Sequence, residues 1–173
     1  MCARGDQQIK NVDYFDTDAP VVSWSTVRTL LTISCVLGLD TKQVNYTLAF
    51  CQAKLNNPIY IDSPQGYQQS GKVLRLKKSL YGLTVAPKLF FETLTEALGK
   101  RGFVASTTDP CMFVHKYMIC LVYVDDCLFF SKDKSNIDKI IASLAEDFDL
   151  KEEDLEDGSI QLRQDGLHCF PRT

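Results

Sequence analysis

The sequence has few histidines, no long apolar run and no closely spaced pair of cysteines. Its only histidines are His115 and His168, and its seven cysteines are scattered without a C-x-x-C spacing. Zinc sites use closely spaced cysteine and histidine ligands, so these absences argue against a structural zinc centre. A membrane-spanning helix needs about 18 or more consecutive apolar residues, and no stretch of this chain approaches that length.

The odd number of cysteines also argues against a disulfide framework. The first ten residues, MCARGDQQIK, are polar and lack the apolar segment of a secretory signal. We therefore expect reduced, mostly buried thiols, an intracellular, cytoplasmic location and no membrane partner.

Charge is unevenly distributed along the chain. The net charge of −3 by itself argues against nucleic acid as a partner. Residues 146–157, EDFDLKEEDLED, hold eight acidic residues and one lysine, and the remainder has 18 basic and 14 acidic residues. The body of the chain is therefore mildly basic. We expect the acidic segment to be a solvated helix end and loop.

Apolar periodicity predicts three helices. The first follows Ser23 and ends at Gly38, the second starts near Pro87, and the third starts near Ser135, with Asp138 completing a weak capping box. Strands are expected at residues 42–47, 58–61, 72–76, 111–115, 119–124, 127–131 and 159–163.

This order of elements predicts an α+β fold. Helices that alternate with hairpin-connected strands favour an antiparallel sheet backed by helices on one face. Residues 119–124 and 127–131 are apolar at successive positions, so these two strands should lie in the middle of the sheet. With 173 residues, 45% of them apolar, the chain can bury one sizeable core.

Asp125 and Asp126 stand side by side between these two apolar strands. One interpretation is an ordinary hairpin turn, although tight turns favour Asn-Gly or Asp-Gly over Asp-Asp. The other is a cation site, because adjacent carboxylates repel each other and a hard cation such as Mg2+ would neutralise them. Two Mg2+ ions commonly drive phosphoryl transfer at a 3′-hydroxyl, and this needs a third carboxylate from elsewhere in the chain.

Four ordered blocks accompany the paired aspartates. They are RGDQQIKNVDYFDTDAPVVSWSTVRTLL, QVNYTLAFCQAKLNNPIYIDSPQGY, LKKSLYGLTVAPKLFFE and LVYVDD. Together they resemble the reverse transcriptase domain of copia-type (Pseudoviridae-like) LTR retrotransposons over residues 3–150, with a weaker similarity at residues 157–167.

The resemblance implies a polymerase palm-and-fingers fold that copies an RNA or DNA template from dNTPs, with two Mg2+ ions. It also implies a Gag-Pol-type polyprotein context with protease, integrase and RNase H, and a virus-like particle in the cytoplasm.

The resemblance also implies roles for individual residues. Asp125 and Asp126 match the paired metal-binding aspartates, and Tyr123 matches a tyrosine that faces template and primer. Phe50 matches the aromatic that lies under the incoming sugar. Packing within the sheet or core is the alternative role for both Tyr123 and Phe50.

Further matches lie outside the hairpin. Tyr81, Gly82, Ala86 and Pro87 match a loop and helix start that contact the new base pair and the template. Arg4 resembles an arginine that could hold the triphosphate. A basic cluster is either solvated surface or a contact to the nucleic-acid backbone; it consists of Lys72, Arg75, Lys77 and Lys78.

Asn45 is the main departure from the family, which has a catalytic aspartate at this position. Residues Gln43-Val44 and Ala49-Phe50 flank it at the expected offsets, so the alignment is secure. An amide oxygen can bind a cation but brings no charge, and we expect polymerase activity to be impaired.

The chain also departs from the family near both ends. We expect a single partial domain over residues 1–173, incomplete at both ends, in which residues 146–173 form an acidic loop and a residual strand. The alternative to an impaired enzyme is an inactive retroelement remnant that keeps at most weak nucleic-acid binding. A third possibility, a host-adapted interaction module, has no positive support in the sequence.

Overall fold

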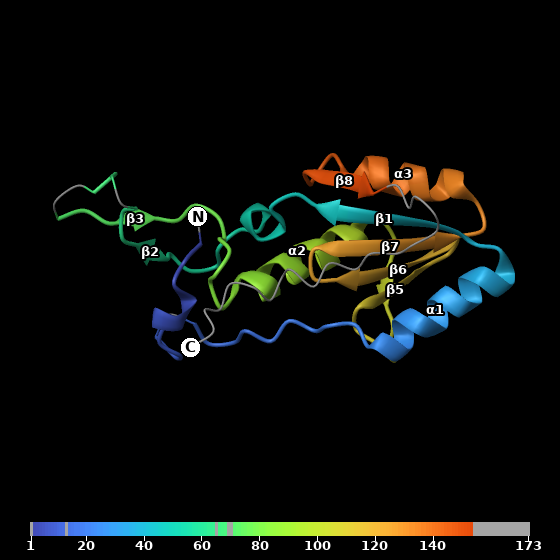
Figure 1. The fold of residues 1–173 in the computed structure, drawn as a ribbon, viewed down its shortest axis with the longest axis horizontal. Helices are drawn as coiled ribbons and strands as arrows, with labels where there is room; N and C mark the ends of the chain where they lie inside the picture. The colour runs from blue at the N-terminus through green and yellow to red at the C-terminus, as the bar shows by residue number, and fades with distance from the viewer. Residues whose placement is uncertain (1, 13, 65, 69–70, 154–173) are drawn as a thin grey trace.

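The protein folds around one six-stranded antiparallel sheet, which confirms the predicted α+β class (Figure 1). The computed structural model describes residues 2–12, 14–64, 66–68 and 71–153. The strand order is β4-β5-β6-β7-β1-β8. The strands are β1 (Asp40–Tyr46), β4 (Val104–Ala105), β5 (Met112–His115), β6 (Met118–Tyr123), β7 (Asp126–Ser131) and β8 (Leu150–Glu153).

Helices cover both faces of this sheet. The helices are α1 (Trp24–Leu37), α2 (Ala86–Lys100) and α3 (Lys134–Leu144), with short 3-10 turns η1 (Gly5–Gln7) and η2 (Ala49–Gln52). Alternate side chains of β7 point to opposite faces: Phe129 packs in the core under α2 and α3, and Phe130 packs under α1. The expectation of helices on one face therefore holds for α2 and α3 but is wrong for α1. Double coverage explains why β7 is buried at every position, as predicted for a central strand.

Local sequence sets the helix ends. The Ser23 side chain accepts a hydrogen bond from the Ser25 amide at the start of α1, and Gly38 ends the helix in the left-handed conformation. Pro87 lies in the first turn of α2, as expected. Helix α3 starts at Lys134, within one residue of the predicted start near Ser135, but the predicted capping box is wrong: the capping side chain is that of Asp133.

The acidic segment is not simply a helix end and loop. Its residues Leu150–Glu153 form β8, which pairs with β1 at the edge of the sheet. Lys42 of β1 lies 2.5 Å from Glu152 and 2.6 Å from Asp138, and these hydrogen bonds raise the pKa of Lys42. The ion pair with Lys42 and the open edge of β1 thus stabilise β8. The acidic composition of this segment did not indicate a strand. Residues 154–157 and the predicted strand at 159–163 lie outside the described residues.

The six described cysteines are all free, and half of them are buried. Cys111, Cys120 and Cys127 lie in the core, Cys51 is half-buried, and Cys2 and Cys35 are exposed. Burial and the charge of Asp109 raise the pKa of Cys111 to about 12, so this thiol stays protonated. Cys169 lies outside the described residues.

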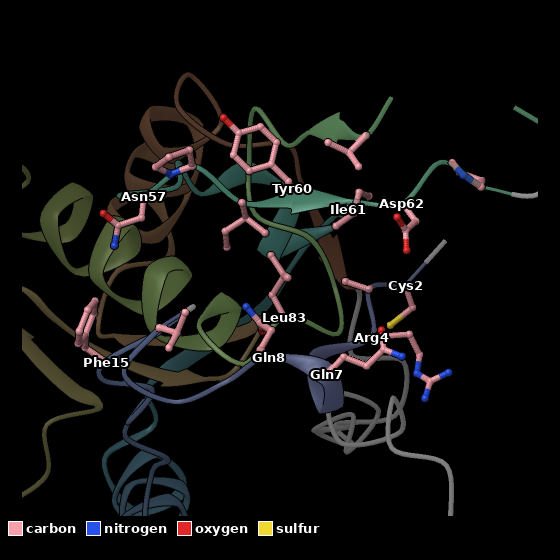
Figure 2. A pocket seen from close by; sticks show the side chains of 16 residues that line it. Cys2, Arg4, Gln7, Gln8, Phe15, Asn57, Tyr60, Ile61, Asp62 and Leu83 are labelled. Atoms are coloured by element: carbon pink, nitrogen blue, oxygen red, sulfur yellow. The ribbon is translucent and has the colours of Figure 1, made fainter. Parts of the chain in front are cut away.

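A small second sheet extends from the main body (Figure 1). It pairs β2 (Tyr60–Ile61) with β3 (Leu74–Arg75), within the two segments predicted as strands. The N-terminal residues and the β2 segment enclose a cavity of about 810 Å³, whose lining includes Arg4, Gln8, Tyr60 and Leu83 (Figure 2). Within the described ranges, no helix is long and apolar enough to cross a membrane.

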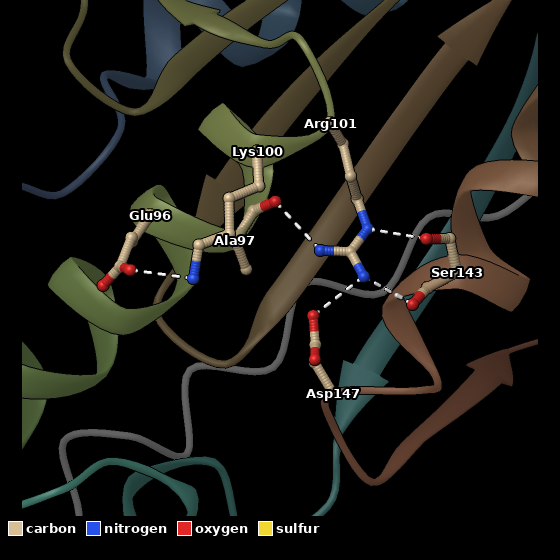
Figure 3. A network of polar contacts seen from close by, with 6 residues as sticks. All are labelled: Glu96, Ala97, Lys100, Arg101, Ser143 and Asp147. Carbon is tan, nitrogen blue, oxygen red and sulfur yellow. Dashed lines mark hydrogen bonds and ion pairs between the residues drawn. The ribbon is translucent and has the colours of Figure 1, made fainter.

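Arg101 joins the end of α2 to the end of α3 (Figure 3). Its guanidinium donates hydrogen bonds to the Ala97 carbonyl (2.9 Å), the Ser143 hydroxyl (2.9 Å) and the Asp147 carboxylate (2.8 Å). Its side chain is only 12% exposed. Among side chains, only the planar guanidinium of arginine presents five N–H donors in a fixed arrangement that can bind several acceptors at once.

We expect Arg101→Lys to lower the free energy of unfolding by about 1–3 kcal/mol, because a single ammonium cannot reach all these acceptors. Urea denaturation followed by circular dichroism would measure the change. Lys100→Ala is the control: it removes only the exposed Lys100–Glu96 ion pair next to it, which should leave stability nearly unchanged. Equal effects of both substitutions would contradict the role of Arg101.

Candidate active site

The β6–β7 hairpin brings the two aspartates to one end of the sheet. Tyr123 and Asp126 are the last paired residues, so Val124 and Asp125 form the two-residue turn. The pair is therefore divided between the turn and strand β7. Only the first turn residue, Val124, has a positive φ (56°), the pattern of a type II′ turn, which usually has glycine there.

Val124 holds this conformation at a cost. For a side-chain-bearing residue the left-handed region costs about 1–2 kcal/mol, and β-branching makes it a genuine outlier. A hydrogen bond from the Tyr46 amide to the Asp125 carbonyl (2.9 Å) ties the turn to β1. Strain that the surrounding structure holds in place is a common property of functional sites.

Asn45 lies directly opposite Asp126. The two are cross-strand partners in the β1–β7 pairing, and the Asn45 side-chain amide donates a hydrogen bond to Asp126 Oδ1 (2.9 Å). Asp126 has no exposed surface. Lys151 of β8 is the partner of Asn45 on its other side. Because directly paired residues share a face of the sheet, Lys151, Asn45, Asp126 and Tyr123 all lie on the α1 face.

These residues only partly fit the site that the sequence predicts for two Mg2+ ions. Asp125 and Asp126 contribute two carboxylates, but the third position supplies a neutral amide whose N–H group donates to Asp126. The residues that the structure describes contain no cluster of three histidine, cysteine, aspartate or glutamate side chains that could hold a metal. The third carboxylate that such a site needs is therefore absent from this position.

Asn45→Asp should destabilise the protein when no divalent cation is present. The change replaces a charge-assisted hydrogen bond with two carboxylates in contact, one of them buried, and should lower the free energy of unfolding by about 2 kcal/mol. Mg2+ should restore the loss by binding between the carboxylates. Thermal unfolding in EDTA and in Mg2+ would measure both effects.

Asn56→Asp is the matched control, because Asn56 is exposed and lies outside both β1 and the β6–β7 hairpin. Its stability should not depend on Mg2+. An Asn45→Asp variant as stable as the wild type in EDTA would contradict the importance of the Asn45–Asp126 hydrogen bond.

Phe50 and Tyr81 form an aromatic pair beside the turn. Their ring centroids are 4.5 Å apart, and Phe50 is 4% exposed. Burial and the nearby Asp125 carboxylate raise the pKa of Tyr81 to about 12, so its hydroxyl stays protonated. Tyr81 thus packs on Phe50, which has little exposed surface for contact with a sugar.

Gly82 is explained by packing within the chain. Its φ is 90°, and a Cβ there would overlap the carbonyl oxygen of Ala3. The Ala3 amide also donates a hydrogen bond to the Tyr81 carbonyl (2.7 Å). The N-terminal segment thus approaches the Gly82 backbone closely, and the contact of this loop with the new base pair and the template stays a prediction.

The other predicted site residues are more dispersed. Ala86 is fully buried, and Pro87 is half-buried beside it. Arg4 is exposed and forms a two-point ion pair with Asp6 (2.9 and 2.7 Å) at the large cavity of Figure 2. None of the residues that line this cavity belongs to the β6–β7 hairpin or to β1. The nucleotide- and template-binding roles of these residues stay predictions.

One aromatic residue near the hairpin was missed by sequence reasoning. The ring of Trp24, the first residue of α1, lies 6.2 Å from the ring of Tyr123, centroid to centroid. The available indication was the position of a large aromatic directly after the capping residue Ser23, but nothing local places it beside Tyr123.

Comparison with known proteins gives matches over most of the chain. The profile of a protein family described as "Reverse transcriptase (RNA-dependent DNA polymerase)" matches residues 1–162. The Retrovirus-related Pol polyprotein from transposon TNT 1-94 of Nicotiana tabacum is 32% identical over 160 residues, which are 88% of this chain and 12% of that protein. The Pol polyprotein from transposon RE2 of Arabidopsis thaliana is 31% identical, over 90% of this chain and 11% of its own.

A yeast protein is similar to the same extent. The Transposon Ty1-DR1 Gag-Pol polyprotein of Saccharomyces cerevisiae is 30% identical over 95% of this chain and 10% of its own length. The chain thus spans about a tenth of the length of the curated relatives it matches. No solved structure matches.

Proposed function

Because the chain belongs to the reverse transcriptase family, as the domain found in copia-type Pol polyproteins, we propose that it is a polymerase domain with impaired catalysis. It binds a primer–template duplex of RNA or DNA, and its transfer of dNTPs to a primer 3′-hydroxyl is weak. The observation that supports impaired catalysis is the hydrogen bond from Asn45 to Asp126. The neutral side-chain amide of Asn45 lies where the two-metal site needs a third carboxylate.

The proposal assigns roles to the hairpin. Asp125 and Asp126 would bind Mg2+, which supplies positive charge to the reacting phosphate when bound. Tyr123 lies on the same face as Asp126 and is half-buried, which suits a contact to the primer. The exposed basic cluster of Lys72, Arg75, Lys77 and Lys78 would contact the nucleic-acid backbone.

A second candidate function is nucleic-acid binding without catalysis. In its favour, the Asn45 amide already satisfies Asp126 Oδ1 without any cation. In either case we propose a Gag-Pol-type polyprotein context with integrase and RNase H, and a cytoplasmic or particle-associated location, on the basis of the family.

The direct test is binding of a fluorescent DNA primer on an RNA template, followed by Mg2+-dependent extension. Binding should weaken steeply as salt rises, because backbone contacts release counterions. Extension by the wild type should be slow or absent. Absence of binding at low salt would exclude both candidate functions, and rapid extension would contradict the impairment.

A further inference from the structure

Trp24 is the only tryptophan in the chain, and it is not buried in the core. It is 49% exposed although it begins a helix whose inner face is apolar. Its ring is tilted by 50° to that of Tyr123, at a centroid distance of 6.2 Å. Isolated exposed aromatics are common on protein surfaces, so exposure alone does not indicate a binding residue.

Helix α1 runs along the sheet face that carries Asp126. Val27 and Leu30 pack against Leu121 and Leu128 on this face. At the far end of the helix, the hydroxyl of Ser34 lies 3.0 Å from that of Thr41, at the end of β1 remote from the hairpin turn. The N-terminal end of α1 is therefore the end nearer to the turn, as the course of the ribbon shows (Figure 1).

The first turn of α1 is held rigidly. Asp109, which is 4% exposed, accepts hydrogen bonds from the Ser23 amide (3.1 Å), the Thr26 hydroxyl (2.7 Å) and the Cys111 amide (3.0 Å). Although burial favours its neutral form, these bonds hold the pKa of Asp109 below its usual value, so it stays ionised. Because Trp24 lies between two of these bonded residues, its backbone is fixed before any ligand binds.

The electrostatic surroundings select the kind of contact. Asp125 and Asp126 would repel a phosphate, so the aromatic rings suit the uncharged face of a base or sugar. Arg28, one helical turn after Trp24, is exposed, and no ion pair within the described ranges involves it. Arg28 can therefore contact a phosphate of the nucleic-acid strand whose base or sugar packs on the aromatic rings.

We propose that Trp24 and Tyr123 form an aromatic platform on which a nucleotide unit of the bound primer–template packs, on the Asp126 face of the sheet. This proposal rests on the proposed function and adds a binding residue to it. Stacking of a base on an aromatic side chain is sequence-tolerant and contributes substantially to binding.

Two signals on one sample test the platform. Titration with a dye-labelled DNA primer on an RNA template reports total binding through the anisotropy of the dye. The fluorescence of Trp24, the sole tryptophan, reports contact at the platform. We expect Trp24 emission to be quenched along the same curve, and Trp24→Ala to weaken binding by about 5- to 150-fold.

Two further variants separate contact from folding. Trp24→Phe keeps an aromatic face and should weaken binding less than Trp24→Ala. Tyr117→Ala removes an aromatic of similar exposure (55%) at the opposite end of β6 and should bind as the wild type. Thermal unfolding of each variant shows whether it is folded.

The outcomes distinguish the platform from the proposed function. Binding that leaves Trp24 emission unchanged and is equal in Trp24→Ala would overturn the platform but keep a nucleic-acid-binding domain. No binding by anisotropy would overturn both. Equal weakening in Trp24→Ala and Tyr117→Ala would also overturn the platform, because the effect would not be local.

Discussion

Asn45→Asp should increase Mg2+-dependent primer extension by about 10²–10³-fold, the usual effect of one preorganised electrostatic group at a reacting centre. The change places a third carboxylate opposite Asp126 with almost no change in volume. The strand register that pairs residue 45 with Asp126 is already in place. A single charge, rather than a rearranged fold, would therefore separate this chain from an active one.

The experiment compares three proteins on one labelled primer and RNA template. Wild type should extend slowly or not at all, Asn45→Asp should extend, and Asn45→Asp combined with Asp126→Asn should lose the gain. The double variant has the same number of carboxylates as the wild type, so it tests whether the gain depends on having carboxylates at both position 45 and position 126. If neither wild type nor Asn45→Asp extends a primer that both bind, the asparagine at position 45 does not explain the impairment.

Gly82→Ala should strongly destabilise the protein, lowering the free energy of unfolding by about 3 kcal/mol or more. The φ of 90° at this position is strained for alanine, which alone costs about 1–3 kcal/mol, and the new methyl group would overlap Ala3. A typical domain is stable by only about 5–15 kcal/mol, so much of the margin would be lost. Chemical denaturation measures the change.

Gly99→Ala is the matched control for this substitution. Gly99 lies within α2, and a Cβ there would meet nothing within 4 Å. Alanine favours helix over glycine, so this variant should gain about 0.5–1 kcal/mol. If Gly82→Ala were as stable as Gly99→Ala, the packing of the N-terminal segment on the Tyr81–Gly82 loop could not be important for stability.

Local sequence features predicted most elements but not how they meet. Ser23, Gly38 and Pro87 mark helix ends through interactions with their own neighbours in sequence, so these boundaries were predictable. Strand β8 was not, because its pairing depends on the open edge of β1 and on Lys42, about 110 residues away. Charge composition at residues 146–157 favoured a loop, and tertiary contacts favoured a strand.

The candidate site shows the same division. The motif around Asp125 and Asp126 and the substitution at Asn45 could be read from the sequence through the family resemblance. The hydrogen bond that joins Asn45 to Asp126 could not, because the direction of an amide depends on its partner across the sheet. Trp24 meets Tyr123 only because α1 crosses the sheet face, which follows from packing and not from sequence spacing.

The place of β1 in the sheet also bears on how the protein folds. Residues 40–46 are the first strand of this sheet in sequence, yet they lie between residues 126–131 and 150–153. The local β5–β6–β7 meander can form without them, whereas insertion of β1 must close long loops and should be slow. Asn45 reaches Asp126 only when β1 pairs with β7, so we expect the candidate site to be assembled late in folding, with the insertion of β1.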